Sequence, residues 1–245
     1  MNLIRKIIKP YSDEDKVFYT ELKQLLGFYP KKLNYYKKAF THRSIRLVDS
    51  KGKRINYERL EFLGDAMLGA VIAAYLYKKS PNGDEGYLTK MRSKIVSREH
   101  LNELGKDFNL IRFVKSNVDK FNVGENIHGN IFEALIGAVF LDKGYNRCYK
   151  FIYKKVIIPY VDIEKLEGKV TSYKGLVIEW CQKTKKKYSF DSYEDTGNQS
   201  VKHFSVKVKI DGKQIAKGRA TSKKKAEELA SKRVYYTFQK EIKNT

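Results

Sequence analysis

The sequence predicts two domains, an all-α domain followed by a smaller α+β domain with elements in the order α-β-β-β-α. Three observations indicate this. Residues 60–77 and 127–141 are long apolar runs with few polar residues, as in buried helices. Residues 188–194 and 203–210 alternate in the manner of strands. Residues 169–245 hold 19 Lys/Arg against 8 Asp/Glu, which is half of the net charge of +22 on under a third of the 245 residues.

The first domain is expected over residues 15–163. It begins with an amphipathic helix over Asp13–Gly27, which the glycine ends. A second short helix is expected within Asn34–Ser44. The basic loop Asp49–Arg54 then leads into a long helix within Asn56–Tyr77.

The rest of this domain is also predicted to be helical. After a loop at Lys78–Gly86, one helix is expected over Tyr87–Lys106 and a last one over Tyr145–Ile163. Asp162–Thr171 is charged, contains glycine and is a candidate linker. The Tyr87–Lys106 helix carries four bases that could meet phosphates: Lys90, Arg92, Lys94 and Arg98.

The long helix carries three carboxylates, Glu58, Glu61 and Asp65, at positions i, i+3 and i+7. On a helix these fall within about 60° of one another. Residues 60–77 are otherwise apolar, aromatic or glycine, so the helix is expected to be buried on all sides. Because no Lys or Arg lies in this run, a metal cation is the expected partner of the acids.

Two other interpretations of this stretch carry less weight. Three acids on a helix usually form a solvated face, but Glu61 and Asp65 have no polar neighbours on their face beyond each other and Glu58. The apolar length would also suit a membrane span. Carboxylates near its start, and the lack of a second comparable segment, count against a span.

The second apolar run repeats this pattern. Glu133 is the only acid within Ile127–Leu141, and Asn130 lies one turn before it on the same face. Two buried carboxylates without basic partners favour one shared metal site. Oxygen ligands without nearby Cys or His favour Mg²⁺ or Mn²⁺.

The second domain is expected over residues 170–241. A helix over Ser172–Thr184 precedes three strands, and Asp211-Gly212 predicts the hairpin before the strand Gln214–Ala220. Ser222 can cap the last helix, Ser222–Glu241. Three cations follow this cap: Lys223, Lys224 and Lys225. The helix dipole disfavours positive charge at this end of a helix, and a bound phosphate would offset that effect. A solvated lysine run is the alternative.

The amino-acid composition indicates the class of partner and the cellular compartment to expect. A net charge of +22 indicates a polyanionic partner, either nucleic acid or an anionic membrane. Cys148 and Cys181 are far apart, which favours a reducing compartment, and a cytoplasmic location is expected. The four histidines show no zinc-type spacing.

Asn56–Leu68, NYERLEFLGDAML, closely resembles the signature of ribonuclease III. AFTHRS at 39–44, DEGYLT at 84–89 and GNIFEALIGAVFLD at 129–142 resemble further elements of that family in the same order. The C-terminal part resembles a double-stranded RNA-binding domain, through Glu179-Trp180 and through SKKKAEELA at 222–230.

The resemblance implies a homodimeric, all-helical endonuclease domain joined to a duplex-RNA-binding domain. It implies Mg²⁺-dependent hydrolysis of double-stranded RNA, such as ribosomal RNA precursors, leaving 5′-phosphate and 3′-hydroxyl ends. By position, Glu61, Asp65 and Glu133 correspond to metal-binding acids, with Asp65 and Glu133 catalytic. Glu58 and Glu85 correspond to acids that line the cleft at the dimer interface.

The sequence departs from the family in two places. Asn130 stands where most members have Asp; its carbonyl oxygen can still bind a metal, but one negative charge is lost. We therefore expect weaker metal binding, with a raised Mg²⁺ requirement or a preference for Mn²⁺. Gly197–Ser200 replaces the usual Gly-Pro-x-His of the RNA-binding domain.

Two other functions compete with a nuclease. A non-catalytic, duplex-RNA-binding dimer would follow if Asn130 disabled the metal site, but retained acids that cost stability argue against it. A basic protein of the membrane surface is disfavoured by the α-β-β-β-α pattern and by the lack of an anchor.

Overall fold

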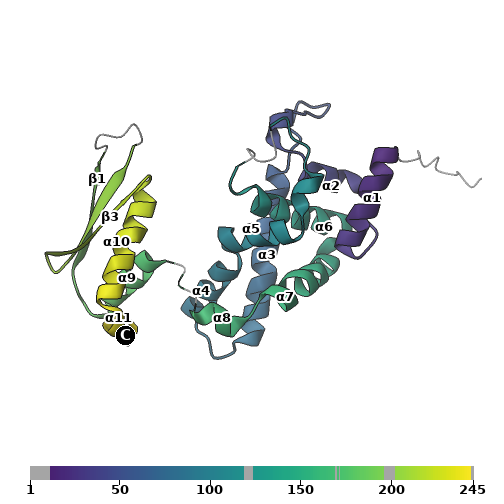
Figure 1. Ribbon diagram of the computed structural model, residues 1–245. Helices are drawn as coiled ribbons and strands as arrows, with labels where there is room; N and C mark the ends of the chain where they lie inside the picture. The colour runs from purple at the N-terminus through teal and green to yellow at the C-terminus, as the bar shows by residue number, and fades with distance from the viewer. Residues whose placement is uncertain (1–11, 119–123, 169, 171, 196–201, 244–245) are drawn as a thin grey trace, which may run out of the picture. The chain divides into compact units, whose positions relative to one another are not determined.

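A computed structural model describes residues 12–118, 124–168, 170, 172–195 and 202–243. The chain divides into two compact units, Met1–Gly168 and Lys169–Thr245, and each is described by itself (Figure 1). The first unit is helical and the second combines helices with a sheet, which confirms the predicted fold class.

The described part of the first unit is mainly helical. Its helices are α1 (Asp13–Leu26), α2 (Leu33–Ala39), α3 (Glu58–Lys79), α4 (Glu85–Ile95), α5 (Arg98–Asp107), α6 (Ile127–Ile152), α7 (Ile158–Tyr160) and α8 (Ile163–Gly168). Two 3₁₀ turns, Arg43–Ile45 and Leu110–Phe113, and a π-helical turn, Tyr153–Ile157, complete it.

Local hydrogen bonds set the bounds of α1 as the sequence predicts. The Ser12 hydroxyl accepts a hydrogen bond from the Asp15 amide, which caps the first turn. Gly27 ends the helix with a φ of 72°, a left-handed conformation that favours glycine.

The prediction of one helix over Tyr87–Lys106 is wrong. The chain forms α4 and α5 instead, because Ser97 leaves the helical conformation and its hydroxyl accepts a hydrogen bond from the His100 amide. This N-cap begins a new helix in a new direction.

The end of the first unit agrees with the prediction only in part. The expected last helix, Tyr145–Ile163, begins after a break within α6 at Gly144, whose φ of 74° and ψ of 179° are not helical. It then passes through the π-helical turn into α7, which ends at Tyr160. The candidate linker contains α8, whose Leu166 is buried. Lys94 is buried as well, and its ammonium group donates to the carbonyl oxygens of Leu166 and Glu167. Lys94 therefore caps α8 and is not available to RNA phosphates.

The core of the first unit is centred on the contact between α3 and α6, where two glycines allow the backbones to meet. A Cβ atom on Gly64 would lie 1.7 Å from the carbonyl oxygen of Glu133. One on Gly137 would lie 2.3 Å from the carbonyl oxygen of Leu60. Larger residues would force the helices apart, since interiors are close-packed.

The second unit packs two helices on one face of a three-stranded antiparallel sheet (Figure 1). Its elements are α9 (Tyr173–Lys183), β1 (Tyr188–Glu194), β2 (Phe204–Ile210), β3 (Lys213–Ala220), α10 (Lys223–Thr237) and α11 (Gln239–Lys243). Tyr188 pairs with Ile210, and Phe204 with Ala220. Asp211 and Gly212 both have positive φ angles, as the predicted tight hairpin requires.

The core of this unit depends on another close approach. A Cβ atom on Gly218 of β3 would lie 2.4 Å from the carbonyl oxygen of Ala226 in α10. The helix therefore lies directly on the sheet, and Trp180 and Val234 are buried beside it.

We predict that Gly64→Ala lowers the free energy of unfolding by about 3 kcal/mol or more, because the new methyl group overlaps the α6 backbone. Chemical denaturation of the full chain measures this change. Gly86→Ala in α4, where the nearest atom to a Cβ is a side-chain oxygen at 3.5 Å, is the control. A shift of less than about 1 kcal/mol is expected there, and an equal shift in both variants would contradict the packing argument.

Candidate active site

The acid stripe of α3 lies on its first two turns, as predicted, but the helix is not buried all round. Glu58 and Asp65 are exposed and Glu61 is half-buried. One face of α3 turns away from α6, so Phe62 is 80% exposed and Tyr77 is 74% exposed. The prediction of complete burial is therefore wrong, because the apolar residues of α3 serve two faces and only one of them packs within the protomer.

The α3–α6 contact brings Glu133 and Asn130 of α6 opposite the acids of α3. A cleft of about 460 Å³ separates the two rows. The residues that line it are Glu58, Glu61, Phe62, Asp65, Val96, Arg98, Leu101, Gly129, Asn130 and Glu133. All four predicted metal-binding residues therefore face one cleft.

The acids of the cleft repel one another. Burial, together with the charges of Asp65 and Glu61, raises the pKa of Glu133 from 4.5 to about 7. Burial and the neighbouring Glu58 also raise the pKa of Glu61. The neighbouring carboxylates thus disfavour ionisation of Glu61 and Glu133, so the cleft favours a bound cation or proton.

Asn130 has a hydrogen-bonded orientation in this cleft. With its side-chain nitrogen turned toward α3, the amide donates to Glu61 Oε1 at 3.2 Å and to the Asn126 carbonyl oxygen at 3.1 Å. In this orientation the nitrogen faces Glu61, so turning the carbonyl oxygen to that side requires the amide to rotate and these two bonds to break. An aspartate would have no such bonds to lose.

Arg98 is a cleft residue whose role the sequence alone does not reveal. It begins α5, is exposed and lines the cleft beside the acids. Its charge opposes the rise in pKa of both Glu61 and Glu133. Residue 98 is separated from both acid rows in sequence by more than 30 residues, so only the tertiary fold places it here.

The donor set fits a hard divalent cation. Three carboxylates and one amide oxygen are ligands that Mg²⁺ and Mn²⁺ prefer. Among the described residues, no three His, Cys, Asp or Glu side chains form a ready-made metal cluster. The carboxylates repel one another, and a cation bound between them would offset that repulsion.

The two predicted cleft acids differ in position. Glu58 lines the cleft, where it accepts a hydrogen bond from the Asn56 side chain at 2.9 Å and lies 3.8 Å from Arg43. Glu85 does not line the cleft of its own protomer. It is exposed at the start of α4 and accepts a hydrogen bond from Thr89.

The predicted RNA-binding lysines are all exposed at the start of α10. Ser222 caps this helix by accepting from the Lys225 amide. The next acids turn away from them: Glu227 pairs with Lys174 at 2.7 Å, and Glu228 accepts from the Ser172 hydroxyl. The N-terminus of α10 therefore keeps its positive potential.

Two other predicted features of this unit are Glu179 and the Gly197–Ser200 departure from the family pattern. Glu179 is exposed on α9 and lies 3.5 Å from Lys183, within a salt bridge. The Gly197–Ser200 departure from the family pattern lies outside the described residues.

Comparison with known proteins assigns the chain to a family. Residues 32–160 match the Ribonuclease-III-like family. A ribonuclease 3 of Zunongwangia profunda is 64% identical over 242 residues, covering 99% of this chain and 100% of the relative. The chain belongs to the ribonuclease III family. A ribonuclease 3 of Flavobacterium psychrophilum is 63% identical, with 99% of both chains covered.

The two units of this ribonuclease III family member each have a counterpart. Residues 173–235 match the double-stranded RNA binding motif. The solved nuclease domain of ribonuclease III from Campylobacter jejuni matches with a TM-score of 0.51 and 30% identity, covering 57% of this chain and 96% of that domain. That structure's description concerns flexibility in a region involved in dimer formation.

We predict that Glu133→Gln stabilises the metal-free protein at pH 8 but not at pH 5. The folded-state pKa of about 7 exceeds the ordinary value of 4.5, so the folded protein retains a proton that the unfolded chain releases between these values. The parent therefore loses folding free energy as the pH rises from 4.5 toward 7. Because glutamine does not ionise, the Glu133→Gln variant does not lose it.

Thermal unfolding in EDTA across this pH range tests the prediction. The control is Glu103→Gln, at an exposed position of α5. If both variants follow the pH profile of the parent, Glu133 is not held in a repulsive environment.

Proposed function

We propose that this chain is a double-strand-specific endoribonuclease whose hydrolytic centre is the cleft between α3 and α6. The observation that carries the proposal is the convergence of Glu61, Asp65, Asn130 and Glu133 across the Gly64–Gly137 contact. Membership of the ribonuclease III family supports the same activity.

The side chains divide the work by their environment. Asp65 is exposed and lines the cleft, where a phosphodiester would lie. Glu61 of α3 and Glu133 of α6 are half-buried where these two helices meet, so the helix contact holds them in place. Asp65 and Glu133 are proposed as catalytic, and Arg98 offsets part of the negative charge that a phosphate meets on entry.

Glu61, Asp65, Asn130 and Glu133 would hold Mg²⁺, with Mn²⁺ as a substitute. When bound, the ion supplies a nucleophilic water and neutralises charge at the phosphate, which leaves 5′-phosphate and 3′-hydroxyl ends. The raised pKa of Glu133 means that a proton competes with the cation, so binding strengthens as the pH rises.

The second unit is proposed to hold the substrate. Duplex RNA is read mainly by shape, with cations on phosphates and other contacts in the minor groove. Lys223, Lys224 and Lys225 are placed for the phosphates, and α9, which carries Glu179, is the proposed minor-groove element. Ribosomal RNA precursors and structured messenger RNA in the cytoplasm are the proposed substrates.

The exposed face of α3 supports a homodimer. Phe62, Ala66, Ala70 and Tyr77 are exposed on one stripe of this helix. By length and composition alone α3 could also span a membrane, but its acids and its glycine contact with α6 suit a folded domain. A second copy that covers this apolar stripe would remove it from water. Glu85 would then act at the dimer interface.

Cleavage of a long perfect RNA duplex tests the hydrolytic centre. We expect cutting with Mg²⁺ or Mn²⁺ and none with EDTA. Glu133→Gln should lower kcat by about 100-fold or more while leaving duplex binding intact, since it removes a metal-binding charge but no exposed cation. Tight binding without cutting under any metal would favour the alternative of a non-catalytic RNA-binding dimer.

The same assay tests the role of Asn130. Asn130→Asp should lower the Mg²⁺ concentration for half-maximal rate by about tenfold, because it restores a charge and removes the hydrogen bonds that hold the amide. An unchanged Mg²⁺ requirement would show that Asn130 does not limit metal binding.

The dimer is tested by sedimentation. We predict that the parent sediments as a dimer and that Ala70→Glu sediments as a monomer, because a charge would be buried in the subunit interface. Asn34→Glu, at an exposed position of α2, should leave the dimer intact. A monomeric parent at micromolar concentration would refute the proposed interface.

A further inference from the structure

A basic hairpin lies immediately before α3, beside the acid cleft. Leu47–Ile55 folds back on itself: Val48 bridges Arg54, and the Ile55 amide donates to the Leu47 carbonyl oxygen at 2.8 Å. Gly52 has a φ of 74° at the turn, which favours glycine. Several backbone hydrogen bonds therefore give this connection a defined shape.

The acid within the hairpin serves its backbone. Asp49 Oδ1 accepts hydrogen bonds from the amides of Lys51 and Lys53, each at 2.9 Å. These bonds, together with the charges of Lys53 and Lys38, hold the pKa of Asp49 below its ordinary value. The carboxylate thus fixes the turn, while the two lysine side chains extend from it.

Most of the cations around the hairpin form no salt bridge with an acid. Residues 43–59 hold six Arg or Lys against Asp49 and Glu58. Five of the six form no salt bridge among the described residues: Arg46, Lys51, Lys53, Arg54 and Arg59. All five are exposed. Like charges held this close favour an anion from outside the protomer.

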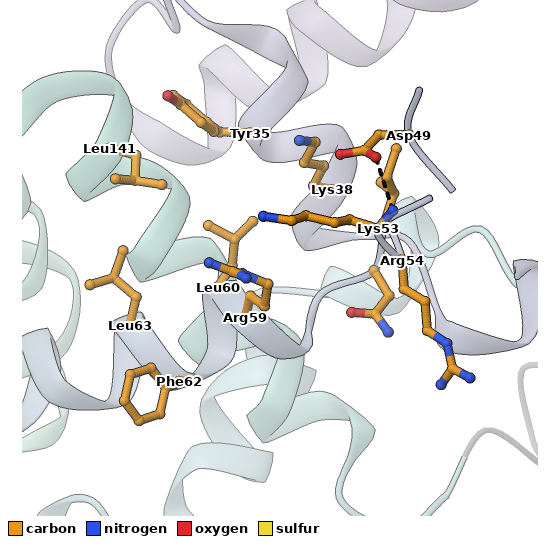
Figure 2. Close-up of a pocket in the computed structure, with 12 residues that line it drawn as sticks. Tyr35, Lys38, Asp49, Lys53, Arg54, Arg59, Leu60, Phe62, Leu63 and Leu141 are labelled. Carbon is orange, nitrogen blue, oxygen red and sulfur yellow. Dashed lines mark hydrogen bonds between the residues drawn. The ribbon is translucent and has the colours of Figure 1, made fainter. Parts of the chain in front are cut away.

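Three elements direct cations into one pocket of about 530 Å³. Figure 2 shows the nitrogen ends of Lys38 from α2, Lys53 from the hairpin and Arg59 from α3 directed to the same side of this pocket, whereas Arg54 points away. Arg54 lines a second hollow on the hairpin with Arg43 and Arg46. Cations therefore border both sides of the hairpin.

The basic surface adjoins the acid cleft through the first turns of α3. Phe62 lines both the cleft and the basic pocket. Arg59 follows Glu58 by one residue, which places it about 100° around the helix from that acid. A phosphate chain that approaches the acids is repelled by them, so nearby cations must balance that repulsion.

We propose that the Leu47–Ile55 hairpin, with Lys38 and Arg59, binds the phosphate backbone of duplex RNA beside the cleavage cleft. This inference rests on the proposed function only in taking duplex RNA as the ligand. The contact is independent of sequence, because cations on phosphates set position and affinity and do not read bases. The hairpin gives the nuclease unit its own hold on the substrate, in addition to that of the second unit.

The test replaces three hairpin cations in the full chain: Lys51→Gln, Lys53→Gln and Arg54→Gln together. Binding to a short perfect RNA duplex is measured in EDTA by fluorescence anisotropy over a NaCl series. We expect Kd to rise about tenfold at physiological salt, and the slope of log affinity against log salt to fall by about two. In cleavage assays with Mg²⁺, KM should rise by a similar factor with kcat within about twofold.

Two matched variants complete the test. Lys78→Gln, Lys79→Gln and Lys154→Gln together remove the same charge from exposed positions elsewhere in the first unit, and should raise Kd by less than about threefold. Lys51→Arg, Lys53→Arg and Arg54→Lys together keep the charge and should bind as the parent does.

Three results would overturn the proposal. The first is an unchanged Kd and salt slope in the hairpin variant, and the second is an equal loss of affinity in the control that replaces Lys78, Lys79 and Lys154. The third is a hairpin variant that sediments as a monomer. The last would make the hairpin a subunit contact. Failure of the parent to cleave would count against the hydrolytic centre alone, since the binding assay contains no metal and needs no catalysis.

Discussion

The backbone contact between α3 and α6 is the constraint on which the rest of the first unit depends. Gly64 and Gly137 are the residues that let these helices touch. Since Gly64 faces the carbonyl group of Glu133 itself, the same contact fixes how far the acids of α3 lie from the acid of α6. One pair of glycines therefore sets both the packing of the two helices and the spacing of the acids. If larger residues at these positions moved the helices apart, the cleft would widen as well.

The charges of the cleft are balanced by residues from three helices. Burial and the neighbouring carboxylates raise the pKa of Glu61 and of Glu133, while Arg98 of α5 opposes both rises. Asn130 removes a further negative charge and holds Glu61 through its amide. The cleft of this chain is thus less negative than one with aspartate at position 130, which reduces both the repulsion of phosphates and the attraction for a cation.

Helix α3 serves several functions because its faces differ. One face packs on α6, a second carries the acid stripe, and a third presents Phe62, Ala66, Ala70 and Tyr77 to solvent. The hairpin before it adds cations at its N-terminal end. A single helix thereby joins the fold, the hydrolytic centre and the proposed surfaces for a second subunit and for RNA.

Several features follow from the sequence alone because they depend on local interactions. Ser12, Gly27 and Ser222 bound their helices through hydrogen bonds within a few residues, and Asp211-Gly212 sets its hairpin through its own φ angles. The period of the acids places Glu58, Glu61 and Asp65 on one stripe. The break at Ser97 could also have been predicted from the sequence, because serine is a preferred N-cap residue. Here its hydroxyl caps α5 by accepting from the His100 amide.

Other features were decided only by tertiary structure. The sequence of an apolar helix indicates that much of its surface avoids water, but it does not indicate which part packs against the rest of the same chain. The exposure of Phe62 could therefore not be predicted. In the sequence Lys94 resembles a surface base, whereas in the structure α8 covers it. Arg98 lines the cleft because α5 takes a new direction after the break at Ser97, whereas Glu85, at the start of α4, does not line it. Sequence periodicity determines which residues share a face, whereas packing between distant segments determines what that face meets.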